Sequence, residues 1–336
     1  MRNFLFLFLF QFFTFSSYAQ IGGGNTFEFL NLNTSPRVIA LGGYLNAVVD
    51  GDINNGIYNP SLINSMMSNK MNLNYTNYYS DIFYGDAGYC FSLRDQKIIT
   101  AIKFIDYGDF TETNALGHVI GSFTAGEYVF SLGTSESILD SLLYIGMNAK
   151  CAYSSLYEVN STAVLLDFAI TYEFPKKDIV TSLIVKNVGR QITTYHENTQ
   201  EPLPFEISLG ISNRLKYVPL RWHLTFQHLE TPNLFYINSN NSDSIQVNNN
   251  NFGYNMLKHI VFGSELLIHK NVSILLGYNN RKRFDLAIAD RRGLVGFSCG
   301  FSFRINRFHF YYSRASYHYS GPINSFGIVT NFKKID

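Results

Sequence analysis

The chain has 336 residues, a formal net charge of +1 and a pI of about 7.7. This near-neutral balance excludes the strongly basic surface typical of nucleic-acid-binding proteins. Only 15% of the residues are charged while 16% are aromatic, with 30 Phe and 23 Tyr. Such a composition is unusual for a soluble enzyme and is typical of a surface in contact with lipid.

The N-terminus has the three-part pattern of a secretory signal. Arg2 precedes an apolar run from Phe4 to Phe10, and Ser17-Tyr18-Ala19 follows as a cleavage site. We predict that residues 1–19 are a signal peptide, because the apolar run is too short to cross a bilayer. No later segment has about 18 consecutive apolar residues, so a mature chain that spans a membrane must do so as a closed sheet.

Residues 20–69 do not alternate and predict short helices. Ser35 is placed as an N-cap before Pro36, and Gly42-Gly43 ends that helix after Leu41. Further short helices are expected over 44–49 and 53–57, before an Asn-Pro turn. We predict a small plug, here called the hatch, inside a barrel. Its motif residues are Ser35, Arg37, Leu41, Gly42, Gly43, Asp50, Asp52, Asn59 and Pro60.

The hatch residues do not have the spacing of a calcium-binding loop or of a phosphate-binding loop. Asp50, Asp52 and Asn54 match the first ligand positions of an EF-hand, but the glycine comes one residue late and Ser61 replaces the closing Glu. The paired glycines lack the spacing and the lysine of a phosphate loop. We therefore expect no metal and no cofactor, with turn and cap roles for the two aspartates. A cation bound in another geometry is the weaker alternative.

Beyond residue 70 the pattern is that of β-strands. In the stretch 161–174, Val164, Phe168 and Ile170 fall on one face while Asp167 and Thr171 fall on the other. The stretch 293–305 repeats this alternation. One face is continuously apolar and the opposite face is small or polar, although a soluble sandwich would also alternate.

The connections favour a membrane barrel. Short turns alternate with longer loops, as expected for periplasmic turns opposite outer loops. We predict an all-β fold, a transmembrane antiparallel barrel of about 14 strands over residues 70–336, in the bacterial outer membrane. The expected strands are 70–79, 82–93, 97–107, 119–134, 142–154, 161–174, 178–189, 204–214, 219–229, 258–268, 271–280, 293–305, 307–317 and 323–332.

The sequence argues against an enzyme. The eight His residues are scattered, no G-x-S-x-G motif is present, and the three Cys have no C-x-x-C spacing. We expect no catalytic residue, although a site assembled from distant strands would leave no such motif.

One outer loop, residues 280–293, is strongly charged. Its arginines Arg281, Arg283, Arg291 and Arg292 alternate with two aspartates. They could contact an acidic partner or the phosphates of lipopolysaccharide. Local pairing of these charges within the loop is the equally weighted alternative.

Several stretches together resemble a known family. They are the block from Gly22 to Ile63, "MNLNYTNYYSDIFYGDAGYCF", "GYNNRKRFDL" and "GLVGFSCGF". The chain resembles the PorQ family of the type IX secretion system, and more broadly the PorV and FadL-type outer-membrane barrels. That resemblance implies an anchor for a PorZ-like surface protein beside PorU-like and PorV-like components, with cleavage chemistry left to the PorU-like partner. Outer-membrane lipid, and lipopolysaccharide, would be the other partners.

Two classes of function therefore stay open. A scaffold barrel predicts a lumen closed by the hatch and partner contacts through outer loops. A FadL-like channel for small hydrophobic molecules predicts an apolar luminal pocket and a lateral opening at a strand kink. Glycines in the strands would mark such kinks or fit the hatch to the wall, for example Gly85, Gly88, Gly146, Gly263 and Gly300.

Overall fold

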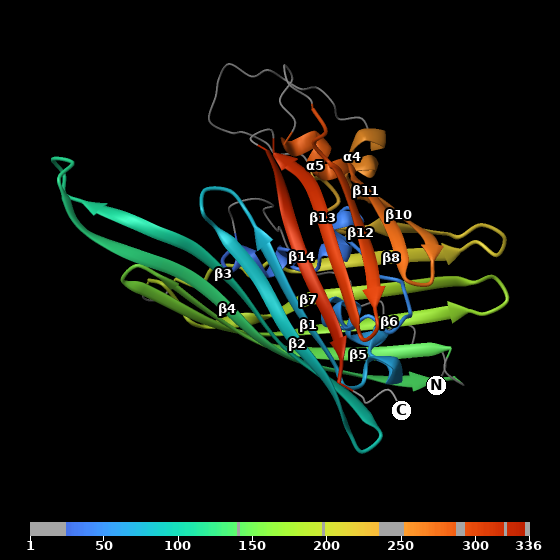
Figure 1. Cartoon of the computed structure of the whole chain (residues 1–336). Coiled ribbons are helices and arrows are strands. Elements are labelled where there is room, and N and C mark those ends of the chain that lie inside the picture. The colour runs from blue at the N-terminus through green and yellow to red at the C-terminus, as the bar shows by residue number, and fades with distance from the viewer. Residues whose placement is uncertain are drawn as a thin grey trace.

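The computed structural model describes residues 25–139, 142–196, 199–234, 252–286, 293–318 and 321–332. The predicted signal peptide, Arg291 and Arg292 lie outside these residues. The described chain forms one closed barrel of fourteen strands, each antiparallel to its sequence neighbours (Figure 1). Pairing of the first strand with the last closes the barrel, from Lys70 opposite Asn331 to Asn77 opposite Asn324. The predicted fold class is confirmed.

The fourteen strands lie close to the predicted ranges. They are β1 (Lys70–Asn77), β2 (Phe83–Leu93), β3 (Gln96–Thr113), β4 (Val119–Ile138), β5 (Leu143–Leu156), β6 (Val159–Phe174), β7 (Ile179–Thr193), β8 (Glu206–Arg214), β9 (Leu220–Phe226), β10 (Ile260–His269), β11 (Val272–Asn279), β12 (Phe297–Ile305), β13 (Phe308–His318) and β14 (Gly321–Asn331).

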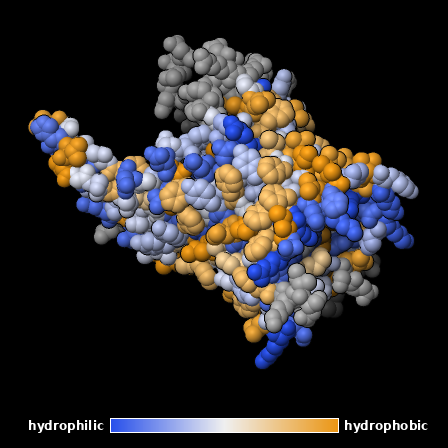
Figure 2. Space-filling model, viewed as in Figure 1, coloured by the Kyte–Doolittle hydropathy of each residue, from blue (hydrophilic) through white to orange (hydrophobic). Residues whose placement is uncertain are grey.

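The barrel is apolar outside and polar inside. On β6, Val164, Phe168 and Ile170 are 47%, 43% and 45% exposed, whereas Asp167 and Thr171 are 1% and 0% exposed. Apolar side chains also gather across the middle of the outer surface in Figure 2. A closed barrel with an exposed apolar belt satisfies its backbone internally and meets lipid with its side chains. The protein is therefore a barrel of the bacterial outer membrane.

Strand lengths differ around the barrel. β3 to β7 have between 14 and 20 residues, whereas β8 to β12 have between 7 and 10. As a result, the β3–β4 hairpin projects well beyond its neighbours (Figure 1).

Two predicted outer loops are wrong for the same reason. The predicted connection 108–118 is strand as far as Thr113, and the predicted connection 155–160 is only a two-residue turn between β5 and β6. Cross-strand pairs continue past the expected loop boundaries, as in the stacked rings of Phe110 and Phe123, whose centroids lie 5.1 Å apart.

The N-terminal segment lies inside the barrel as short helices. α2 (Pro36–Ala40) has Ser35 as its N-cap residue, and α3 (Ile53–Tyr58) is capped by the Asp52 side chain. The 3-10 turns are η2 (Glu28–Asn31), η3 (Pro60–Leu62) and η4 (Ser65–Met67). No helix of the described ranges is long and apolar enough to cross a membrane.

The helix predicted over 44–49 is wrong. This stretch runs without regular structure because its carbonyls bond to side chains rather than to its own backbone. The Asn46 carbonyl accepts from Asn59 Nδ2 at 2.6 Å, and the Ala47 carbonyl accepts from the Ser212 hydroxyl on β8. Two further helices, α4 (Phe252–Lys258) and α5 (Asn280–Leu286), lie in outer connections.

The lipid-facing belt gives a test of membrane placement. Phe301 is the central residue of β12 and is 45% exposed on the outer face. Phe301→Arg should lower the free energy of unfolding in lipid vesicles by about 2–4 kcal/mol, because the charge would lie near the bilayer midplane. The matched control is Tyr217→Arg in the β8–β9 turn, where the side chain is 97% exposed. Equal effects of the two substitutions would contradict the placement of β12 against lipid.

Candidate functional site

The hatch is fastened to the wall by a buried ion cluster centred on Arg37. Its Nε and Nη2 donate to the two carboxylate oxygens of Glu265 on β10, at 2.7 and 3.1 Å. Its Nη1 donates to Asp50 at 2.8 Å and to Asp52 at 3.0 Å. The bidentate contact holds one orientation of the guanidinium plane. Arg37 thereby joins α2 and the Asp50–Asp52 turn of the hatch to β10 of the wall. We call this cluster the latch.

Further wall residues complete the latch. Arg221 on β9 donates to Glu265 at 2.9 Å, and the Tyr311 hydroxyl on β13 donates to Asp52 at 3.0 Å. Burial raises the pKa of Asp52, but the neighbouring Arg37 guanidinium, His309 and the hydrogen bonds from Arg37 and Asn54 together lower it by more, so this pKa lies below its ordinary value. The carboxylate is therefore ionised at neutral pH and the attraction is maintained. The described residues contain no group of three or more His, Cys, Asp and Glu placed to hold a metal.

A second polar contact ties α3 to the opposite wall. Asn54 Oδ1 accepts from Asn72 at 3.1 Å and from Asn74 at 2.7 Å, both on β1. The same two amides donate to Asp86 on β2 at 2.5 and 2.9 Å. The side-chain N–H groups of Asn72 and Asn74 are thus satisfied jointly by the hatch and the wall, while their Oδ1 atoms have no hydrogen-bond partner among the described residues.

The Asn59-Pro60 turn docks on the wall formed by β5 to β7. Asn59 Nδ2 donates to the Ser182 hydroxyl at 2.8 Å, and the Ser61 hydroxyl lies 2.7 Å from Thr171 Oγ1. A Cβ at Gly146 would lie 2.2 Å from the Pro60 carbonyl carbon. Only glycine allows this turn to approach the strand so closely.

The paired glycines that end α2 make an equally close contact with β11. A Cβ at Gly277 would lie 2.1 Å from the Gly42 backbone nitrogen. Gly42 and Gly43 themselves have φ values of 88° and 96°, which disfavour residues with a side chain. Leu41, just before them, is fully buried. Gly263 on β10 also fits the hatch against the wall, because a Cβ there would lie 3.1 Å from the Leu41 carbonyl oxygen.

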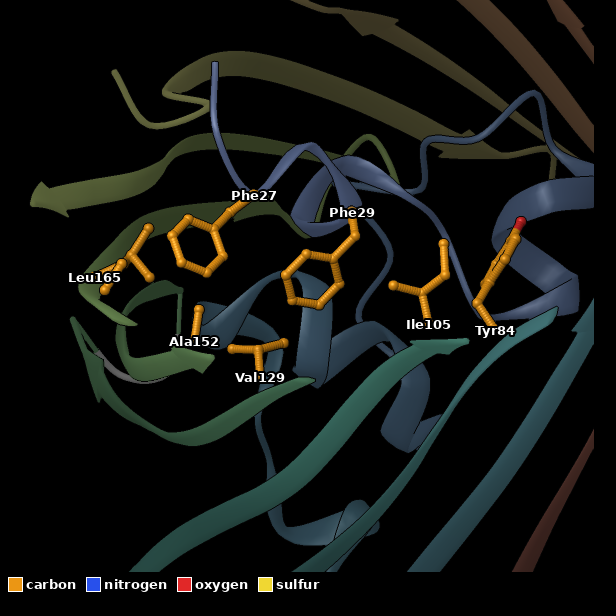
Figure 3. Close-up of a cluster of buried hydrophobic side chains, with 8 residues drawn as sticks. Phe27, Phe29, Tyr84, Ile105, Val129, Ala152 and Leu165 are labelled. Atoms are coloured by element: carbon orange, nitrogen blue, oxygen red, sulfur yellow. The ribbon is translucent and has the colours of Figure 1, made fainter. Parts of the chain in front are cut away.

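The outer half of the lumen has an apolar patch filled by the start of the hatch. Phe27 and Phe29 point toward wall side chains from β3 to β6 (Figure 3). Both rings are 2% exposed. The buried members of this cluster are Phe27, Phe29, Tyr84, Ile105, Val129, Ala152, Ala163 and Leu165. The neighbouring luminal wall is polar instead, so the patch is a distinct apolar site occupied by two aromatic rings.

Little free space remains beside this patch. A cavity of about 60 Å³ lies between the hatch and the wall, lined in part by Tyr58, Asp86, Lys103 and Lys150. Lys103 Nζ donates to the Leu30 and Leu32 carbonyls at 2.9 and 2.5 Å. The hatch therefore fills most of the space in this part of the lumen.

The wall has a break in strand pairing beside the apolar patch. β7 pairs with β8 only from Ile179 to Lys186, while β7 itself continues to Thr193. At the break, Asn187 has a φ of 60° and its backbone N–H donates to Asp167 on β6 at 2.8 Å. Residues of the next connection approach there, with Thr26 N donating to the Pro202 carbonyl at 2.9 Å. We call this place the β7–β8 seam.

The charged outer loop is locally paired where it is described. Arg281 lies 3.4 Å from Asp285 within α5, and Arg283 donates to the Gly293 carbonyl at 2.9 Å. These contacts match the alternative of local pairing. Contact with a partner or with lipopolysaccharide stays a prediction.

Sequence reasoning identified Arg37, Asp50 and Asp52 but not their wall partner. Glu265 lies 228 residues from Arg37, so no local pattern joins them. An available signal was a carboxylate at an inward position of a predicted strand, since such a charge needs a buried partner. The aromatic pair Phe27 and Phe29 was also missed.

The chain is similar to known proteins in structure but not detectably in sequence. No family model matches the chain, and no curated protein matches its sequence. The toluene transporter TbuX of Ralstonia pickettii is similar, with a TM-score of 0.51 and 12% identity over 89% of this chain and 98% of TbuX. The toluene transporter TodX of Pseudomonas putida has a TM-score of 0.52 and 10% identity over 89% and 97%. At such identities the likeness concerns the fold, and the resemblance to PorQ stays a prediction.

The latch can be tested by removing its central cation. Arg37→Met leaves Asp50 and Asp52 without their guanidinium and Glu265 with Arg221 alone, and it should destabilise the seating of the hatch by about 3–5 kcal/mol. Faster protease cleavage of the hatch in vesicle-embedded barrel, together with higher single-channel conductance, would report this. Arg94→Met in the exposed β2–β3 turn is the control. A variant at Arg37 that is as protected and as non-conducting as the control would show that the latch does not hold the hatch.

Proposed function

We propose that the protein is an outer-membrane conduit for small hydrophobic molecules, described here in its closed state. The observation that carries the proposal is the apolar luminal patch occupied by Phe27 and Phe29. A lumen that only carried a scaffold would have no need for an apolar binding surface beneath its plug. We propose no catalytic role.

The proposed route begins at the patch and ends at the periplasm. A solute would replace the two Phe rings, because it offers the wall the same apolar contact. The β7–β8 seam lies next to this patch and is the natural lateral entry, since fewer strand hydrogen bonds must separate there. Passage onward requires the hatch to move, and the latch sets the free energy of that step.

The structural neighbours support this choice over the scaffold. TbuX and TodX are toluene transporters, and this chain matches each of them over nearly its whole length. These neighbours support the proposal only through their shared fold. The apolar patch is independent support, because it is observed in this chain.

Uptake measurements test the proposal. Phe27→Ala combined with Phe29→Ala empties the patch without touching the latch, so uptake of labelled toluene by cells carrying the barrel should rise several-fold over the wild-type barrel. The matched control is Phe168→Ala with Phe174→Ala, which removes two rings from the lipid face. Uptake by the luminal variant no greater than by cells without the barrel would refute the conduit.

A second candidate is the anchor of a type IX attachment complex, with a PorZ-like surface protein as partner. The observation that favours it is the projecting β3–β4 hairpin, whose tip exposes Leu116, Val119 and Ile120 at 81%, 69% and 61%. Exposed apolar side chains grouped in one place are typical of interaction sites. On this proposal the hairpin is the docking element and the closed lumen is its permanent state.

Co-purification tests the second candidate. Leu116→Asp with Ile120→Asp should lower recovery of the PorZ-like protein with the barrel in mild detergent by about tenfold, because charges replace the apolar contact. Tyr217→Asp, at the opposite end of the barrel, is the control. Unchanged recovery with the hairpin variant, or no recovery with the wild type, would exclude this role for the hairpin.

A further inference from the structure

The end of the barrel that carries the short turns encloses a second, much larger cavity. Its volume is about 840 Å³, and it lies beneath the latch, bounded by the turns that follow β8, β10 and β12. The short turns and the end of β14 at Asn331 lie at this end, which identifies it as the periplasmic end. We call this cavity the vestibule.

The vestibule is lined by seven Lys and Arg side chains against three Asp and Glu side chains. The inner part is balanced. Its three carboxylates are those of the latch, and they face Arg37, Arg221 and Lys70. Arg37 and Arg221 pair with the carboxylates directly, and Lys70 Nζ donates to the Gly51 carbonyl at 2.5 Å between the two aspartates. The latch therefore has no charge left over for a ligand.

The outer part of the vestibule is not balanced. Four exposed cations lie at the ends of β8, β10 and β12 or in the turns that follow them: Arg214, Lys270, Arg304 and Arg307. None of them forms an ion pair with any residue that the structure describes. The register brings these turns together, since the Arg304 N–H donates to the Asn271 carbonyl at 2.8 Å and Arg214 lies opposite Arg221. Four positive charges thus surround one opening, and none of the described residues supplies them with a paired counter-charge.

We propose that the vestibule binds a small polyanion from the periplasm, one carrying two or more carboxylate or phosphate groups. Four cations around an enclosed space attract such a ligand more than a monovalent ion, because each added anionic group can reach another side chain. The volume lies in the range of small-molecule sites. A hydrophobic solute fits this outer part poorly, so the site differs from the apolar luminal patch.

Isothermal titration of the full barrel in a zwitterionic detergent tests the proposal. The probes are inorganic pyrophosphate and citrate, at low and at physiological salt. Arg304→Gln with Arg307→Gln should weaken binding by about tenfold or more, because two of four charge-assisted contacts are lost. Lys176→Gln with Lys177→Gln removes two charges from the β6–β7 turn at the same end but outside the vestibule, and it should leave affinity unchanged.

The titrations distinguish a phosphate ligand, a carboxylate ligand and the absence of a site. Tighter binding of pyrophosphate identifies phosphate as the preferred group, and tighter binding of citrate identifies carboxylate; either supports the site when the vestibule variant alone is weakened. Absence of binding to the wild type, or equal weakening by both variants, overturns the proposal. Because no uptake is measured, the result does not depend on whether the protein conducts hydrophobic molecules.

Discussion

The charge of one arginine inside a membrane barrel is the constraint on which the rest of the arrangement depends. Arg37 is buried between hatch and wall, and a buried guanidinium is tolerated only when carboxylates surround it. Glu265 supplies the wall half of that environment, while Asp50 and Asp52 supply the hatch half. The hatch therefore has one seated position, and the apolar patch, the seam and the vestibule are defined by it.

The two ends of the lumen offer opposite chemistry. The outer half presents apolar side chains covered by two Phe rings, and the periplasmic mouth presents uncompensated cations. The latch separates them. A barrel lined by one type of side chain would offer a solute the same surroundings throughout. In this barrel the latch lies between an apolar compartment and a cationic one.

The strands could be predicted from the sequence because their signal is local. Alternation in β6 gave its range to within two residues and its inward and outward faces correctly. The outer connections were predicted less well, because cross-strand pairing in β3–β4 extends beyond the membrane, where hydrophobic alternation no longer reports it. The hatch contacts could not be predicted, since Arg37 and Glu265 are joined only by closure of the barrel.

The close fit of glycine against glycine in the lumen has a consequence for assembly. Backbone of the hatch touches β11 at Gly277 and β5 at Gly146 with no room for a side chain. A segment held this tightly cannot thread into a finished cylinder. The hatch precedes β1 in the chain, and β14 comes last, so the plug must be seated while the sheet is still open. The strands thus assemble around the seated hatch, and β1 and β14 pair last.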